Sequence, residues 1–312
     1  MFKERNDVVT ASVLSGRGNE PATYVVRWRT MVLAALVLVA CFGRPLYQLA
    51  RFAAGSELYS HIFIIPLISL YLIRLYRKDL IWHGEPARKL ALPFFVSGIL
   101  LLCLYWFPTH GASKAKGVDY LAVTSLSFLL FFIGILCLFL GKNILRAIAF
   151  PLALLIFIVP IPVFVMERVV DFLQYGSAAV AEAMFKLAGT PTFREDLIFR
   201  LPGTSLRVAP ECSGIHSTLV LLITSLVAGY LFLRAPWKRS VLTLAVIPLA
   251  LLRNGFRIVT IGELCVHVGP HMVESPIHRK GGPIFFALSL VPFFLLLYFL
   301  RRSHKKSPTG LK

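Results

Sequence analysis

The chain has 312 residues, of which 57% are hydrophobic and 15% are charged, and its formal net charge is +18. A soluble globular domain could not cover so much apolar material with so few charges, which excludes a soluble fold. The apolar residues also form runs of about twenty, the length at which an α-helix crosses the hydrocarbon core of a bilayer. Because these runs lack the alternation of a membrane β-barrel, the sequence predicts an all-α polytopic membrane protein.

Eight spans are predicted along the chain, between two polar or basic tails. Segment 1–29 is expected to be a disordered cytoplasmic tail, residues 30–300 a membrane domain, and residues 301–312 a basic cytoplasmic tail. The predicted spans cover Met31–Leu49, Leu58–Leu75, Leu90–Phe107, Tyr120–Leu140, Ala147–Met166, Gly214–Leu233, Ser240–Glu263 and Pro283–Leu300.

The distribution of basic residues predicts the orientation of the spans. With the N-terminus inside, 20 of the 33 lysines and arginines fall in cytoplasmic segments, as the positive-inside rule requires. We therefore expect a multi-pass protein of the cell membrane (inner or plasma) with both termini cytoplasmic. Its positive charge then faces anionic membrane lipid, and no nucleic-acid partner is expected.

One connection is long, and it is predicted on the extracytoplasmic face, at residues 167–213 between spans five and six. Apolar residues recur every three or four positions over 167–188, which predicts a helix lying at the membrane interface. Two short β-rich runs then flank a Pro202-Gly203 turn, which predicts a hairpin. Such a hairpin can present an edge to an extended peptide.

Cys212 follows this insertion, at the predicted start of span six. Pro210, Glu211 and Ser213 around it are typical of a helix start. A thiol there would meet the positive end of the helix dipole, which favours the reactive thiolate. The alternative is a cysteine that only packs near the interface. His216 lies four residues later, so on a helix the two would share a face and could pair.

Two arginines, Arg253 and Arg257, flank Asn254 within the otherwise apolar span seven. An arginine in a span is energetically costly, so it usually faces the bundle interior and marks a functional site. At spacing i, i+4 the two arginines share a helix face. The alternative is that one or both reach the outer head groups.

A histidine-rich segment follows, and His61 is a further polar residue, at the start of span two. His267, His271, Glu274 and His278 have spacings that would line one helical face and resemble a metal site. Prolines interrupt that helix, however, and no His-Glu-x-x-His motif is present. A single histidine used for proton transfer is the favoured interpretation.

Two other classes of function stay open at this point. One is an intramembrane metalloprotease that uses His267, His271 and Glu274. The other is a non-enzymatic transporter or membrane scaffold, with Arg257 lining a pathway. The scarcity of central intramembrane acids and the absence of an evident inverted repeat count against a transporter.

Taken in order, several short motifs resemble those of the exosortase/archaeosortase family of multi-spanning cysteine transpeptidases, over about residues 57–300. The motifs are Tyr59-Ser60-His61, Pro66 to Tyr71, Pro160-Ile161-Pro162, Leu201-Pro202-Gly203, Glu211-Cys212-Ser213-Gly214-Ile215, Asn254-Gly255-Phe256-Arg257-Ile258, and His278 with Gly282. The chain departs from the family at two positions. Ile62 stands where glycine is usual, and His216 stands where arginine is common.

The resemblance implies an eight-span bundle whose active site faces the extracytoplasmic side. It implies Cys212 as nucleophile, Arg257 as the second catalytic residue and His278 as the third. His216, Arg253, Asn254 and His61 are candidate supporting residues, and His216 could compete with His278 as acid and base. The implied substrates are secreted proteins with a C-terminal sorting tail, made of a short motif, an apolar span and a basic end. The product would pass to a cell-surface acceptor, with no cofactor and no metal.

Overall fold

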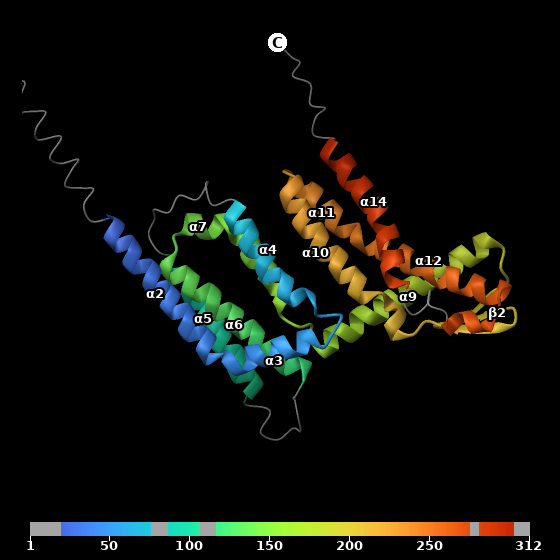
Figure 1. The fold of residues 1–312 in the computed structure, drawn as a ribbon, viewed down its shortest axis with the longest axis horizontal. Coiled ribbons are helices and arrows are strands. Elements are labelled where there is room, and N and C mark those ends of the chain that lie inside the picture. Colours follow the sequence, from blue (N-terminus) through green and yellow to red (C-terminus); the bar gives the residue numbers. More distant parts are fainter. Residues whose placement is uncertain (1–19, 76–86, 107–116, 275–280, 303–312) are drawn as a thin grey trace, which may run out of the picture. The chain divides into compact units, whose positions relative to one another are not determined.

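The computed structural model is mostly helical and contains one small three-stranded sheet (Figure 1). It describes residues 20–75, 87–106, 117–274 and 281–302, with only the backbone described at 20–27, 106, 211–212 and 273–274. The chain divides into two compact units, Met1–Val163 and Phe164–Lys312. Each unit has its own apolar core.

The first unit is built from helices whose apolar faces meet. Its elements are α2 (Glu20–Cys41), α3 (Gly43–Ala54), α4 (His61–Leu75), α5 (Arg88–Trp106), α6 (Val118–Phe139), α7 (Lys142–Ala147), α8 (Ala149–Leu154) and the 3₁₀ helix η3 (Leu155–Ile158). Met31 of α2, Ile135 and Leu136 of α6, and Ile148 and Leu152 near α8 are buried in one cluster. A cavity of about 460 Å³ lies beside this cluster and is lined almost entirely by apolar side chains.

The second unit combines helices with the sheet. Its elements are α9 (Val163–Ala188), β1 (Phe193–Glu195), β2 (Ile198–Leu201), β3 (Thr204–Arg207), the 3₁₀ helix η4 (Pro210–Ser213), α10 (Ile215–Phe232), α11 (Pro236–Leu244), α12 (Val246–His267), the 3₁₀ helix η5 (Pro270–Glu274) and α14 (Gly282–Arg302). One core cluster joins α9, β2, β3 and α12, around the fully buried Phe185 and Phe199. A second joins α10, α11, α12 and α14 around Leu221, Leu242 and Phe293.

Five described helices are long and apolar enough to cross a membrane, and the number is up to seven if each of two broken pairs is one span. The broken pairs are Trp28–Cys41 with Gly43–Ala54, and Ala149–Ile158 with Val163–Ala188; the shorter apolar helix His61–Leu75 lies outside that test. A multi-pass helical protein is therefore confirmed. The predicted number of eight spans stays a prediction.

Two of the predicted spans are not single straight helices. The first, Met31–Leu49, is not one straight helix, because α2 and α3 meet at an angle of 70°. Pro45 lies in the first turn of α3, where its missing N–H removes no helical hydrogen bond but the helix cannot run through it unchanged. In the fifth, Ala147–Met166, the helix breaks after Ile158, where Val159 is extended and Pro160 and Pro162 lie between η3 and α9.

The predicted helix over 167–188 is confirmed, and it begins four residues earlier, at Val163. The predicted hairpin is confirmed as β2 and β3, which pair antiparallel from Leu201 and Thr204 on either side of the turn. Gly203 in that turn has φ +76°, a left-handed conformation that favours glycine. The strand β1, which pairs with β2 on its other side, was not predicted.

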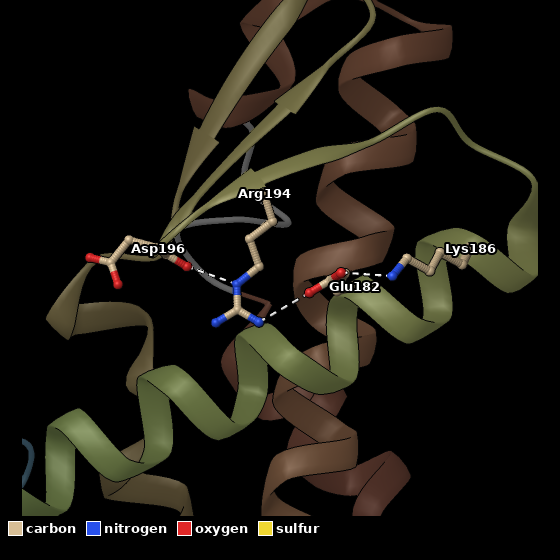
Figure 2. Close-up of polar contacts among 4 residues, drawn as sticks. All are labelled: Glu182, Lys186, Arg194 and Asp196. Atoms are coloured by element: carbon tan, nitrogen blue, oxygen red, sulfur yellow. Dashed lines mark hydrogen bonds and ion pairs between the residues drawn. The ribbon is translucent and has the colours of Figure 1, made fainter.

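Arg194 of β1 fastens the sheet to α9. As Figure 2 shows, its guanidinium reaches Glu182 of α9 (Nη1 to Oε2, 3.2 Å) and donates from Nε to the carbonyl of Asp196 (2.7 Å). Lys186, one turn along α9, binds the other oxygen of Glu182 at 2.8 Å. The inner face of the sheet is buried against α9 and α12 through Phe199, Leu206 and others. The sheet is thus held on α9 by both apolar and charged contacts.

Candidate active site

The strand β3 leads the chain toward Cys212, and its end is fixed by two hydrogen bonds. The N–H of Val208, a residue only 1% exposed, donates to the carbonyl of Leu197 at 2.9 Å. The carbonyl of Val208 accepts a hydrogen bond from Nε2 of Gln174 on α9, at 2.8 Å. Because Gln174 is itself buried, this bond is shielded from solvent. The chain therefore leaves the sheet at a defined point, four residues before Cys212.

A short 3₁₀ turn and one left-handed residue then carry the chain into α10. Cys212 lies in η4 (Pro210–Ser213), and Gly214 follows with φ +72° before α10 begins at Ile215. A Cβ placed on Gly214 would lie 2.8 Å from Nη2 of Arg253 and 3.3 Å from Oδ1 of Asn254. Both the conformation and the close approach require glycine at this position.

Arg253 of α12 holds this turn. Its Nη2 donates to the carbonyl of Gly214 at 3.1 Å and to Oγ1 of Thr218 at 3.2 Å. Thr218 in turn donates its hydroxyl to the same Gly214 carbonyl, at 2.8 Å. The arginine is 7% exposed, and its Nη1 is buried with no hydrogen-bond partner among the residues that the structure describes. A buried cationic donor thus lies beside a backbone position two residues after Cys212.

Asn254 and Arg257 extend the same region of α12. Asn254 is 2% exposed, and it lies so close to Gly214 that its Oδ1 would touch a Cβ added there. Arg257 is half-buried one turn beyond Arg253. The prediction that both arginines lie on one helix is confirmed.

The helix assumed for the pairing of Cys212 with His216 is not present, and the pairing itself stays a prediction. It assumed one continuous helix from residue 212, on which residues four apart share a face. The left-handed Gly214 separates the two residues, and only His216 belongs to α10, where its side chain is exposed. Cys212 lies three residues before α10 begins, so it is also not the first residue of that helix. Its side chain is outside the part that the structure describes.

The family was identified by comparing the chain with known proteins. The profile described as transmembrane exosortase (Exosortase_EpsH) matches residues 52–295, which is most of the chain. The chain belongs to the transmembrane exosortase family. No curated protein and no solved structure gave a match.

Among the remaining candidates in this exosortase, His61 belongs to the first unit. It is buried at the start of α4, with Nδ1 3.0 Å from the carbonyl of Leu58 and Nε2 3.1 Å from the carbonyl of Phe157 in η3. The ring therefore links the turn before α4 to η3. The position of His61 indicates a structural role, in which it holds two elements of the first unit together.

The histidines after span seven are distributed over different elements. α12 ends at His267, whose Nε2 lies 3.2 Å from Oε2 of Glu263, and Thr190 also donates to Glu263. His271 is exposed in η5. Within the described ranges, no group of three His, Cys, Asp or Glu side chains could hold a metal ion. The side chain of Glu274 and the whole of His278 lie outside those ranges.

Three residues shape this site in ways that the sequence did not predict: Gln174, Gly214 and Thr218. Gln174 looks like a solvent-facing residue of an amphipathic helix, yet it is buried against Val208. Gly214 and Thr218 carried a weak signal, a glycine directly after Cys-Ser and a hydroxyl one turn later. Their role depends on Arg253, 35 and 39 residues further along the chain.

Proposed function

We propose that this exosortase is a membrane cysteine transpeptidase that cleaves the C-terminal sorting tails of secreted proteins through a thioester on Cys212. The observation that carries the proposal is the contact of Arg253 with the carbonyl of Gly214. It ties the turn containing Cys212 to the helix that bears Asn254 and Arg257. Membership of the exosortase family supports the same reaction class.

In the first step, the Cys212 thiolate attacks the carbonyl carbon of the scissile peptide bond. The resulting oxyanion collapses, the C–N bond breaks, and the leaving amine takes up a proton. The acyl group is then held as a thioester on Cys212. Attack by an acceptor nucleophile, or by water, breaks the thioester and returns the thiol.

Arg257 is proposed to stabilise the thiolate and the oxyanion, because a fixed charge in a water-poor site acts strongly on developing negative charge. His278 is proposed to protonate the leaving amine and to deprotonate the incoming nucleophile. Arg253 is proposed as a positioning residue that fixes the turn between Cys212 and α10, with Asn254 packed beside it. His216 is the alternative acid and base, since it is exposed near the start of α10.

The cellular setting belongs to the proposal as well. The active site would face the extracytoplasmic side of the cell membrane, with both termini in the cytoplasm. The substrate tail would carry a short motif, an apolar span that lies in the bilayer and a basic end. The cleaved protein would pass to a cell-surface acceptor or be released.

Co-expression with a tailed secreted protein from the same genome tests the proposed function. Wild-type enzyme is expected to shorten the substrate at its C-terminus, and Cys212→Ala is expected to abolish that shift. Cys41→Ala is the matched control, because Cys41 is exposed in α2 of the first unit and its loss should leave cleavage normal. Cleavage by Cys212→Ala at the wild-type rate would end the proposal.

A further inference from the structure

Among the described residues no strand lies beside β3 on its outer side, and the pairing register shows which of its backbone groups point outward. The N–H of Val208 donates to the carbonyl of Leu197, one step beyond the Ile198–Arg207 pair that ends the β2–β3 ladder, so these two residues occupy a hydrogen-bonded position. In an antiparallel ladder, hydrogen-bonded and non-hydrogen-bonded pairs alternate. Counting back along β3, Ser205 and Arg207 belong to the non-hydrogen-bonded pairs. Their N–H and C=O groups therefore point away from β2.

These two residues are exposed, and no hydrogen bond of either is found in the part of the chain that the structure describes. The opposite edge is less suitable. By the same alternation, Arg194 is the one residue of β1 whose backbone points outward, and its side chain is already committed to Glu182. β3 thus offers two successive outward-facing residues, spaced as an added strand needs them.

The open edge runs directly toward the proposed nucleophile. Arg207 lies five residues before Cys212, a span of at most about 17 Å even for fully extended chain. β3 cannot easily move away, because Leu206 and Val208 are buried in the core that joins the sheet to α9 and α12. The hydrogen bond from Gln174 to Val208 fixes the point where the strand ends. A peptide aligned on β3 would therefore be held in a constant relation to the Cys212 turn.

We propose that the substrate docks as a fourth strand, with the extended residues next to its scissile bond paired to the backbone of Ser205 and Arg207. The inference rests on the proposed function, since it assumes that the substrate is a peptide cleaved at Cys212. Strand addition draws affinity from main-chain hydrogen bonds, and side chains at alternate positions supply specificity. The enzyme would then recognise the extended backbone of the tail motif. Every second side chain of the docked peptide would lie over the exposed face of the sheet that bears Arg207.

A proline at position 205 tests the docking without breaking the sheet. Because the Ser205 N–H points outward, Ser205→Pro removes a donor to the substrate and no hydrogen bond to β2. We expect at least a tenfold fall in kcat/KM for tail cleavage, mostly through KM. Ser205→Ala removes the same hydroxyl but keeps the N–H, so it is expected to cleave at least tenfold faster than Ser205→Pro. Equal cleavage by Ser205→Pro and Ser205→Ala would overturn the inference.

A second measurement uses wild-type enzyme and so does not depend on the folding of the proline variant. Synthetic peptides covering the residues before the apolar span of the tail are N-methylated one position at a time. Strand docking predicts losses of at least tenfold at alternate positions, with tolerated positions between them. A profile without that two-residue period would contradict it.

Cys212→Ala separates this failure from failure of the proposed function. Continued cleavage by Cys212→Ala would contradict the proposed function. The docking mode alone would be contradicted if three results came together. Cys212→Ala would lose cleavage, Ser205→Pro would cleave normally, and the methylation profile would be flat.

Discussion

The two units of the chain use their buried polar groups differently. In the first unit, both ring nitrogens of His61 lie against backbone carbonyls, and the hydroxyl of Ser69 donates to the carbonyl of Pro151 at 2.7 Å. In the second unit, Arg253 binds Gly214 and Thr218 through one nitrogen, while its Nη1 has no partner among the described residues. The first unit uses these polar groups to join helices, and the second keeps a buried charge against the backbone of Gly214, two residues after Cys212.

The two units also differ in the polarity of the side chains that line their interiors. The 460 Å³ cavity of the first unit is lined almost wholly by carbon, including Phe132, Leu136 and Leu152. Around Gly214 in the second unit, the buried Arg253 and Asn254 and the half-buried Thr218 bring guanidinium, amide and hydroxyl groups together. A cavity without polar groups can accept apolar chains but cannot stabilise a developing charge. The contrast favours the second unit as the place of the proposed peptide cleavage.

The largest expected effect that tests this contrast is that of Gly214→Ala. The new Cβ would lie 2.8 Å from Arg253, and alanine is strained at φ +72°. We expect cleavage to fall by a hundredfold or more and the free energy of unfolding to fall by about 2 kcal/mol or more.

Gly203→Ala is the matched control, because Gly203 has φ +76° and a Cβ added to it would meet nothing within 4 Å. It should cost about 1 kcal/mol of backbone strain and leave cleavage nearly unchanged. Thermal unfolding and tail cleavage measure both variants. Similar losses of cleavage in the two would show that the contact with Arg253 is unimportant.

Arg253→Met is expected to have the next largest effect. The apolar side chain fills similar space but leaves the Gly214 carbonyl without its guanidinium donor, at a cost of about 1–3 kcal/mol. Cleavage should fall roughly 10- to 100-fold, which corresponds to about 1.4–2.7 kcal/mol. Arg253→Lys, which keeps the charge but not the planar fork, should recover part of the stability.

A positioning role for Arg253 also predicts a readout that simple destabilisation would not give. Alkylation of Cys212 by maleimide should slow in Arg253→Met even at temperatures where the protein is fully folded. The exposed Arg200→Ala provides the control for loss of one arginine. If Arg253→Met showed unchanged alkylation and normal cleavage, Arg253 would have no positioning role in the site.

The smallest effect on cleavage is expected from His61→Ala. Losing the contacts to Leu58 and Phe157 should lower the free energy of unfolding by about 1–3 kcal/mol. Cleavage per folded molecule should change less than threefold. His61→Gln keeps an N–H donor that can reach one of the two carbonyls and should recover part of the stability. If His61→Ala were fully stable but could not cleave, His61 would instead have a role in catalysis.

The sequence predicted those features that depend on neighbouring residues. The helix over 167–188 follows from its apolar periodicity, and the hairpin follows from the Pro202-Gly203 turn between β-rich runs. Arg253 and Arg257 could be placed on one helix because their spacing is local. Membership of the family also followed from short motifs in a fixed order, and the matched range of 52–295 agrees with that prediction.

The sequence failed where a contact between distant residues decides the conformation. The pairing of Cys212 with His216 looked helical because nothing local shows that Gly214 is left-handed; its conformation is coupled to Arg253 on another helix. Gln174 looked solvent-facing because its partner, the carbonyl of Val208, is 34 residues away. β1 is only three residues long, too short for a periodic signal, and it exists because β2 is beside it.

The packing of α9 on α12 determines which segments of chain can be exchanged between exosortases. A Cβ on Gly255 would lie 2.7 Å from Val180, and one on Gly262 would lie 2.5 Å from Phe185, so two ridges of α9 fit into two gaps of α12. Sliding either helix by one residue would close both gaps. Residues 163–267 are therefore the smallest segment that carries the cysteine turn together with the helix pair that shapes it. A graft of the whole proposed site would also have to include His278.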